Sequence, residues 1–505
     1  MMAGAFPHLD WGWLAWIGLV PILLTLPQLR LRGALAMAFT FGVAYFGSLL
    51  YWLMVCGSLA IGPGLGVIAW SIAVVAQTLV MFMFAGGAWW LSRRPNPLAW
   101  LVGVPALWTV LEWIRSLGQL GTTWGDISVA QHSYLPILQV SKLTGSWGIT
   151  FIAVCVNMAI AELLRDKFSG LPQAPLGPSA SRLRFRFSTA VLAVAAMTIA
   201  GGLIVLRTER LQPTYKAAAL QPDIDPNVNW GQFRPVDPVY VTNTLNAYVD
   251  GGSASGAQVV MWPETVFPGY LRDDPQLAQP VIDEARRYHQ TILVGTGERY
   301  PDSGPEGNAL TEVTPEGTIA NSYLKRHLVP WGEYVPFRKI FPILAALHLT
   351  LYDRRFGAPI QPLFQSPEGP LGSVICYESS YPELTREEVA RGAGLLAIVT
   401  DDTWYGRTAA PYQHANFAVL RAVENDRYVV RAAATGISMI VDPNGRVLST
   451  APLFTSKTLV AAVESRHNLT FYSRYGDWFV GVCIALILVM SMPWRSRARE
   501  VEAEE

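Results

Sequence analysis

The chain has 505 residues, of which 51% are apolar and only 15% are charged, and its acidic and basic residues balance at 38 each. This length allows two or three domains, but the composition is a poor match to a soluble protein. The apolar excess must therefore be concentrated in particular segments of the chain.

Most of the apolar excess lies in runs near the two ends, and most of these runs have roughly the 20 residues that cross a bilayer as a helix. The runs lie near residues 11–29, 34–55, 64–91, 98–116, 144–163, 187–206 and 478–492. The residues between the sixth and seventh runs have the charges, turn pairs and short alternating strands of a globular domain. We therefore predict a membrane helix bundle over 1–207, an inserted domain over 208–475, and a C-terminal transmembrane helix with a cytoplasmic tail over 476–505.

Basic residues follow every second predicted span. They are Arg30, Arg32, Arg93, Arg94, Arg165, Lys167, Arg182, Arg184, Arg186, Arg495, Arg497 and Arg499. Because short cytoplasmic loops carry the Lys/Arg excess, we expect these loops inside and the inserted domain on the extracytoplasmic side. An odd number of spans then places the N-terminus outside, unless a preceding helix is missing from this sequence.

Cys376 is the only cysteine of the inserted domain, which argues against a disulfide framework there. The others, all in predicted spans, are Cys56, Cys155 and Cys483. A lone thiol is either a small buried apolar residue or a nucleophile. A predicted strand over 372–375 ends at Cys376, and a helical stretch with Pro382 in its first turn follows. Backbone N–H groups and a helix N-terminus at such a junction lower a thiol pKa and can hold an oxyanion, so the neighbours favour the nucleophile.

A cysteine nucleophile also needs a base and a cation, and the inserted domain contains candidates for both. Glu264 follows an apolar strand that ends in "MWP", and Lys325 precedes an apolar turn with Glu333 eight residues later. Each of these residues lies beside a predicted strand end, so they could converge in space. A glutamate after a strand is also commonly a solvated loop residue, and the pattern alone leaves both interpretations open.

The order "WPET", "YLKRHLVPWGEYVPF" and "GSVICYES" resembles the Glu-Lys-Cys triad of the nitrilase superfamily. Together with the helical bundle and one C-terminal helix, the chain resembles the apolipoprotein N-acyltransferase family, which completes bacterial lipoproteins. "LVPWGEYVPF" is the most specific segment, because ordinary soluble nitrilases and amidases lack it. The resemblance implies a multi-pass α-helical membrane bundle that carries an inserted α/β nitrilase-like domain, an α-β-β-α sandwich.

The resemblance also implies residue roles, with Cys376 as nucleophile, Glu264 as general base and Lys325 as the cation that stabilises the oxyanion. It assigns supporting or substrate-binding roles to Trp230, Glu333, Tyr377 and Glu378. The implied reaction is ping-pong: a phospholipid acylates Cys376, and the α-amine of a diacylglyceryl-cysteine at a lipoprotein N-terminus then takes the acyl chain. The implied location is the bacterial inner membrane, with the catalytic domain on the periplasmic side.

We expect a monomer with phospholipid and diacylglyceryl apolipoproteins as substrates, and neither a nucleic-acid partner nor a cofactor. The histidines at 132, 289, 327, 348 and 414 show no ligand spacing, so no metal is inferred. A membrane-tethered amidase that uses water as acceptor, and a non-catalytic lipid- or lipoprotein-binding relative, are the alternatives. The amidase should lack the membrane segments, and the silent relative should have lost a triad residue.

Predictions also follow from two departures from the family pattern, from one apolar run and from one charged pair within a predicted span. Asp401 and Ala434 stand where the family commonly has asparagine, and Asp401 could raise the pKa of Cys376 or change substrate preference. The apolar run 341–352 is either a lid or arm at the membrane interface or a plain buried helix. Glu112 and Arg115, spaced i, i+3 in a predicted span, are expected to pair with each other, with a lipid-headgroup contact as the second interpretation.

Overall fold

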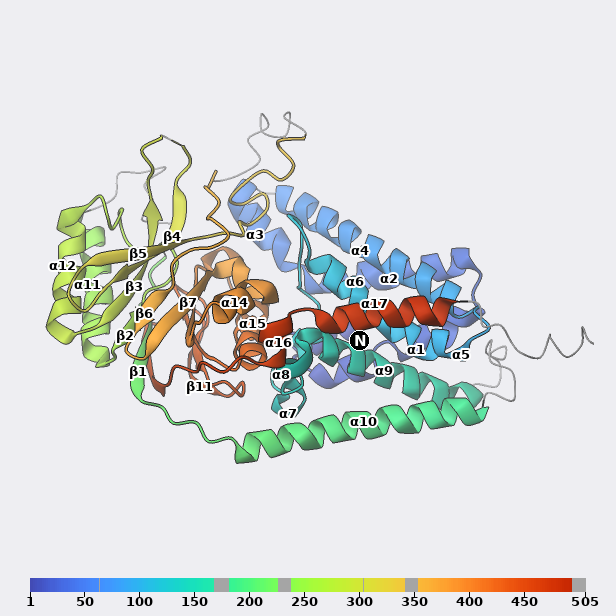
Figure 1. Ribbon diagram of the computed structural model, residues 1–505. Coiled ribbons are helices and arrows are strands. Elements are labelled where there is room, and N and C mark those ends of the chain that lie inside the picture. The colour runs from blue at the N-terminus through green and yellow to red at the C-terminus, as the bar shows by residue number, and fades with distance from the viewer. Residues whose placement is uncertain (63, 168–180, 226–237, 303, 341–352, 493–505) are drawn as a thin grey trace, which may run out of the picture.

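The computed structural model describes all residues except 63, 168–180, 226–237, 303, 341–352 and 493–505. Figure 1 shows a helical part beside a part built from two β-sheets. Trp230, the apolar run 341–352 and most of the C-terminal tail lie outside the described residues.

The helical part contains long apolar helices and several short ones. Its helices are α1 (Val20–Thr25), α2 (Leu31–Leu49), α3 (Trp52–Ile61), α4 (Leu65–Leu91), α5 (Pro97–Leu101), α6 (Gly103–Ser116), α7 (Leu135–Leu138), α8 (Ser141–Thr144), α9 (Ser146–Leu164), α10 (Ser181–Thr208) and α17 (Trp478–Ser491). Its short 3₁₀ helices are η1 (Met2–Ala5), η2 (Gly12–Trp16), η3 (Leu26–Gln28), η4 (Val129–Gln131) and η5 (Arg165–Lys167), whereas η8 (Cys376–Ser380) and η9 (Thr403–Tyr405) follow strands of the two-sheet part.

Within the described residues, four helical segments are long and apolar enough to cross a membrane: α4, α5 with α6, α9 and α10. The α2–α3 pair adds a fifth if its 55° bend lies within one span. Only 11% of the most apolar stretch of α10 is buried inside the protein, so this helix presents apolar side chains outward. Such bare apolar surface is unfavourable in water and favourable in lipid.

Besides the bent α2–α3 pair, two further predicted spans differ from one continuous helix of bilayer length. The run 11–29 is divided into η2, α1 and η3, and Pro21 and Pro27 each lie in the first turn of a new helix. Proline lacks the N–H that would continue the preceding helix, which explains the breaks. The last helix, α17, has 14 residues, fewer than the roughly 20 that span a bilayer without adjustment.

The strands form two six-stranded sheets in the described chain, in the orders β12-β1-β2-β3-β4-β5 and β11-β10-β9-β8-β7-β6. The strands are β1 (Tyr215–Gln221), β2 (Val259–Met261), β3 (Thr291–Glu298), β4 (Gly307–Val313), β5 (Ile319–Leu324), β6 (Phe364–Ser366), β7 (Gly369–Ile375), β8 (Leu395–Thr400), β9 (Tyr428–Ala433), β10 (Ser438–Val441), β11 (Val447–Ala451) and β12 (Lys457–Val463). β1, β2 and β3 pair in parallel, as do β7, β8 and β9.

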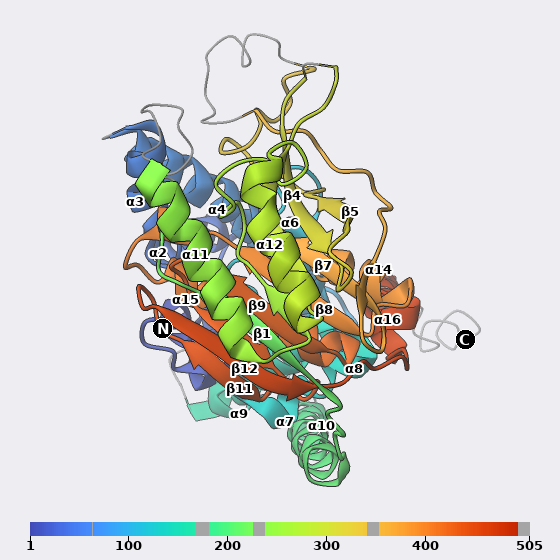
Figure 2. The ribbon, with the colours of Figure 1, turned by 90° about the vertical axis from the view of Figure 1, so that its left-hand side faces the viewer.

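The two sheets pack face to face, and helices cover their outer faces. One apolar core lies between the two sheets, and one further core lies between each sheet and the helices on its outer face. The helices of this part are α11 (Pro238–Ser255), α12 (Pro275–Tyr288), α14 (Pro382–Ala390), α15 (Ala410–Asn425) and α16 (Phe471–Tyr475). Figure 2 shows α11 and α12 in front of the strands, with α15 behind them. The result is the expected α-β-β-α sandwich.

Buried polar residues of the bundle hold the loop that follows α6. Arg115 Nη2 pairs with Asp126 Oδ1 at 2.8 Å and also donates to the Trp124 carbonyl at 2.7 Å. Glu112 accepts from the backbone N–H of Ile127 at 3.0 Å. The expectation of a structural role was therefore right, but the expected partner was wrong, because the folded loop supplies Arg115 with a closer carboxylate than Glu112.

Basic loops gather at one end of the bundle. Arg93 Nη2 donates to the Leu29 carbonyl at 2.8 Å, and Arg165 Nη2 donates to the Leu23 carbonyl at 3.1 Å. These contacts join the residues that follow the third and fifth predicted spans to the second half of the first span. Figure 1 shows this end, beside α5, on the side of the bundle away from the two sheets.

Candidate active site

The predicted triad residues follow strands of both sheets and converge at one edge of the sandwich. Glu264 comes three residues after β2, Lys325 directly follows β5, and Cys376 directly follows β7. β2 and β7 belong to the parallel parts of their sheets, where neighbouring strands end at the same edge. Strand ends at such an edge are where α/β folds gather functional side chains.

Glu264 and Lys325 form a buried ion pair that Glu333 completes. Lys325 Nζ lies 3.0 Å from Glu264 Oε1 and 3.0 Å from Glu333 Oε1. Lys325 is 1% exposed and Glu264 is 5% exposed. The Asn308 amide donates to both carboxylates, at 2.7 Å to Glu264 and 3.2 Å to Glu333. The structure thus brings together three of the residues named from the sequence.

The charges in this cluster keep the lysine ionised. Burial by itself lowers the pKa of Lys325, but the carboxylates of Glu264 and Glu333 raise it well above its usual range. Burial likewise raises the pKa of Glu333, yet the ammonium of Lys325 lowers it overall. An ammonium has three donors, and the described residues supply acceptors for two of them at Lys325. The third N–H is available to a substrate oxygen.

Cys376 has an unusual backbone and a protonated side chain. Its φ is +56°, a left-handed conformation that residues other than glycine rarely adopt. Burial raises the pKa of its thiol well above the usual range and Glu264 raises it further, while Lys325 lowers it. The expectation of a lowered pKa was wrong, because burial dominates and α14 begins only at Pro382. The thiol therefore needs a base before it can act as a nucleophile.

Glu378 is fully buried near Cys376 and connects the segment after Lys325 with the end of β7. Its carboxylate accepts four hydrogen bonds. The donors are Arg326 N at 2.6 Å, His327 N at 2.8 Å, Ile375 N at 2.7 Å and Tyr323 Oη at 3.0 Å. Glu378 thereby ties the segment after Lys325 to the end of β7, and so fixes the spacing between Lys325 and Cys376.

Tyr377 connects the nucleophile segment to the bundle. Its hydroxyl donates to the Gly121 carbonyl at 2.7 Å, and its ring stacks on Trp124 with 5.6 Å between ring centroids. Gly121 and Trp124 belong to the loop that Arg115 holds. The bundle and the sandwich therefore meet directly beside Cys376.

The two departures from the family pattern lie close to the ion pair. The backbone N–H of Asp401 donates to Glu264 Oε2 at 2.8 Å, and the backbone N–H of Ala434 donates to the Thr400 carbonyl at 3.1 Å. Burial raises the pKa of Asp401 to about 7. The carboxylates that raise the pKa of Cys376 are Glu264 and the neighbouring Asp402.

Sequence reasoning missed two residues that position Glu264. Asn308, on β4, bridges the two carboxylates. Gly295, on β3, lets the chain before Glu264 pass closely, because a Cβ at this position would lie 1.8 Å from the Pro263 carbonyl oxygen. Neither residue has a local sequence signature, since each acts on a segment from another strand.

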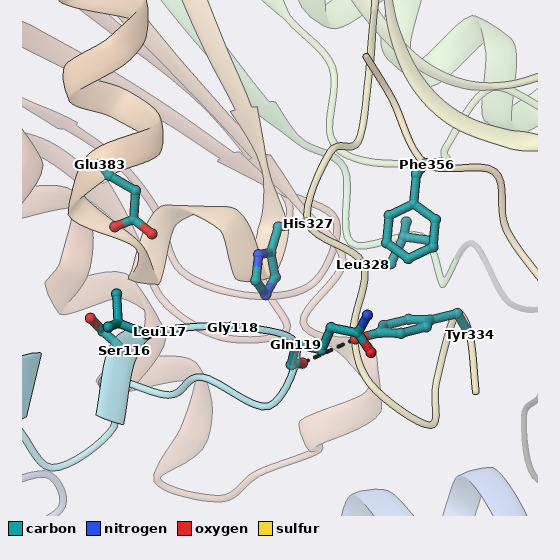
Figure 3. A pocket seen from close by; sticks show the side chains of 9 residues that line it. All are labelled: Ser116, Leu117, Gly118, Gln119, His327, Leu328, Tyr334, Phe356 and Glu383. Carbon is teal, nitrogen blue, oxygen red and sulfur yellow. Dashed lines mark hydrogen bonds between the residues drawn. The ribbon is translucent and has the colours of Figure 1, made fainter. Parts of the chain in front are cut away.

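A cavity of about 280 Å³ opens beside the site. Figure 3 shows His327 pointing toward the Gly118–Gln119 loop, with Leu328 and Phe356 on one side and Glu383 on the other. Tyr334 Oη donates to the Gln119 carbonyl at 3.0 Å, and both residues line the cavity. Burial and Lys325 lower the pKa of His327 to about 4, so its ring is uncharged at neutral pH. The described residues include no group of three or more His, Cys, Asp or Glu placed to hold a metal ion.

Comparison with known proteins covers nearly the whole chain. Residues 216–467 match the carbon-nitrogen hydrolase family, and residues 1–159 match the apolipoprotein N-acyltransferase N-terminal domain. The apolipoprotein N-acyltransferase of Geobacter metallireducens is 31% identical over 96% of this chain and 91% of its own length. The protein of the same name from Gloeobacter violaceus is 30% identical over 98% of this chain and 92% of its own length.

Among solved structures, an amidase from Nesterenkonia sp. AN1 matches 53% of this chain and 99% of its own length, with 20% identity and a TM-score of 0.38. The full-length relatives and the two family matches agree with the apolar helices and with the two-sheet sandwich. This chain therefore belongs to the apolipoprotein N-acyltransferase family, whose members are acyltransferases of the carbon-nitrogen hydrolase superfamily.

Proposed function

We propose that this protein transfers a fatty acyl chain from a phospholipid, through a thioester on Cys376, to the N-terminal amine of a diacylglyceryl lipoprotein. The observation that carries the proposal is the buried Glu264–Lys325 pair, whose charges both act on the protonated Cys376 thiol. A base and a cation directed at one thiol are what acyl transfer through cysteine requires. The names of the full-length relatives supply the substrate class.

In the first half-reaction, Glu264 takes the thiol proton and the Cys376 sulfur attacks the ester carbonyl of the phospholipid. The third N–H of Lys325 stabilises the negative oxygen of the tetrahedral intermediate. Collapse of this intermediate breaks the ester C–O bond, and Glu264 returns the proton to the departing lysophospholipid oxygen. The enzyme is left as a thioester with Glu264 again ionised.

In the second half-reaction, the α-amine of the diacylglyceryl-cysteine attacks the thioester carbonyl. Glu264 accepts a proton from the amine as the C–N bond forms, and Lys325 again stabilises the oxygen. Cleavage of the C–S bond releases the amide, and Glu264 returns its proton to the Cys376 sulfur. Proton and charge thus balance over the complete cycle.

Both proposed substrates are membrane lipids, which fits a catalytic domain joined to apolar helices. We propose residues 1–207 as the bundle, 208–475 as the catalytic domain and 476–505 as the C-terminal span with its tail. The basic loops at the end of the bundle away from the sheets support an inner-membrane orientation with the catalytic domain on the periplasmic side. A membrane-tethered amidase has less support, because the relatives that match the full chain are named as acyltransferases.

Incubation of the full-length protein with phospholipid alone is expected to build a thioester on Cys376, because no amine is present to discharge it. Mass spectrometry should find the acyl group on the Cys376 peptide, labile to neutral hydroxylamine and absent in Cys376→Ala. A diacylglyceryl peptide with a free N-terminus should discharge the enzyme into an amide, and its N-acetylated form should not. Steady release of free fatty acid without a trapped enzyme would instead identify a hydrolase.

Asp401→Asn is expected to change the pH dependence of acylation. The pKa of Asp401 is about 7, so in the natural protein a negative charge appears beside Glu264 as the pH rises through 7 and repels its carboxylate, a repulsion that ends when Glu264 takes the thiol proton. Asparagine removes this charge, so the ratio of variant to natural acylation rates should be near one at pH 6 and should fall by up to about tenfold at pH 8. A ratio that stays constant across this range would exclude Asp401 as the titrating group.

A further inference from the structure

His414 contacts the backbone of the nucleophile Cys376 and takes no part in either proposed half-reaction. It is fully buried on α15, and its Nε2 lies 3.0 Å from the Cys376 carbonyl oxygen and 3.1 Å from Ser379 Oγ. Its other ring nitrogen, Nδ1, lies 2.8 Å from Asp402 Oδ1. One imidazole therefore bridges the backbone of the nucleophile and a buried carboxylate.

The two ring nitrogens of His414 contact different groups. A carbonyl oxygen only accepts hydrogen bonds, so Nε2 must donate to Cys376. Asp402 Oδ2 also pairs with Arg431 Nη2 at 2.7 Å. Burial by itself raises the pKa of Asp402, but Arg431 and His414 lower this pKa below its usual range. Arg431 Nη2 also lies 3.3 Å from Nδ1, so Asp402 and Arg431 both contact the ring on the side away from Cys376. The ring is thus oriented from one side and donates to the nucleophile from the other.

The backbone at Cys376 needs such support. A left-handed conformation at a residue with a side chain is strained and persists only where its surroundings enforce it. The Cys376 carbonyl is held by His414 Nε2 and by the Ser379 hydroxyl, which donates to it at 2.8 Å. If this carbonyl turned, the chain could relax and carry the thiol away from Glu264 and Lys325.

We propose that His414 is a positioning residue for acyl transfer, which holds the Cys376 carbonyl through Nε2 so that the thiol faces the Glu264–Lys325 pair. The inference rests on the proposed function, and it adds a residue outside the triad and outside the supporting set named from the sequence. Asp402 and Arg431 act one step further away, because they orient the imidazole. A displacement of about 1 Å at a reacting atom can cost about 10²-fold in rate, so the contact is kinetically significant.

Two variants of His414 distinguish the contact that Nε2 makes with Cys376 from the contact that Nδ1 makes with Asp402. In His414→Gln the amide nitrogen can occupy the place of Nε2 and still donate to Cys376, whereas in His414→Asn it reaches only the place of Nδ1 and keeps the contact with Asp402. Asn425→Ala, at the far end of the same helix, is the matched control for loss of a buried hydrogen bond. Each full-length variant is incubated with phospholipid alone, and the rate of thioester formation, the half-saturating phospholipid concentration and the unfolding temperature are measured.

We expect His414→Asn to form the thioester about 10²-fold more slowly than the natural protein, with a half-saturating phospholipid concentration within about twofold of the natural value. His414→Gln should recover to within about tenfold, while both variants unfold at similar temperatures and Asn425→Ala acylates normally. Equal rates for the two variants, or a faster Asn variant, would overturn the inference and indicate that His414 serves only to hold Asp402. Failure of the natural protein to form any thioester would instead refute the proposed function.

Discussion

Glu264→Gln is expected to slow acylation of Cys376 by about 10²–10⁴-fold, the range typical of losing a general base. Burial raises the pKa of the thiol well above neutral, so very little thiolate exists without a base. Glu264 is the base candidate because, among the charged groups near Cys376, its carboxylate has the largest effect on the pKa of the thiol. A glutamine at 264 has almost the same shape but cannot take the proton.

Glu312→Gln is the matched control for this experiment. Glu312 is also a buried carboxylate, on β4, and it accepts a hydrogen bond from the Gln365 N–H at 2.9 Å. Both variants exchange one accepting oxygen for a donating nitrogen, and Glu264→Gln also leaves Lys325 with Glu333 as its remaining carboxylate partner, so the unfolding temperature of each variant is measured beside its rate. Single-turnover rates of thioester formation should therefore fall only in Glu264→Gln, and normal acylation by this variant would remove Glu264 as the base.

The family, the enzyme class and the α-β-β-α sandwich beside apolar helices were predicted from the sequence, and the comparisons and the structure confirm them. Glu264, Lys325 and Cys376 could be named because each lies beside a predicted strand end in a recognisable motif. Their roles in catalysis stay a prediction. Trp230 and the run 341–352 fall outside the described residues.

Other features depend on contacts that no local pattern contains. An apolar run does not specify where its helix breaks, so the division of residues 11–29 was missed. The spacing of Glu112 and Arg115 allows a pair, but the tertiary fold supplies Asp126 instead. The pKa of Cys376 depends on how deeply the fold buries the thiol, and the roles of Asn308 and Gly295 depend on a loop that crosses from another strand.

Lys325→Met is expected to abolish measurable acylation, because it removes two effects at once. The tetrahedral oxygen loses its charge partner, an effect of about 10²–10³-fold for a single oxyanion donor. The carboxylates of Glu264 and Glu333, which both contact Asn308, also lose the cation between them. Two buried like charges this close favour uptake of a proton, so the base is partly neutralised. Lys325→Arg need not restore the rate, since a planar fork does not replace a compact ammonium in a tight site.

The double variant Lys325→Met with Glu333→Gln distinguishes catalysis from stability. Removing one partner of a buried ion pair typically costs about 3–5 kcal/mol, because an uncompensated charge remains. Neutralising Glu333 as well removes one of the two remaining charges, so the double variant should unfold at a higher temperature than Lys325→Met. It should still fail to acylate Cys376 at a measurable rate, because no cation faces the developing oxyanion. Recovery of acylation together with stability would show that Lys325 is needed only for folding, and near-normal acylation by the single variant would remove Lys325 from the triad.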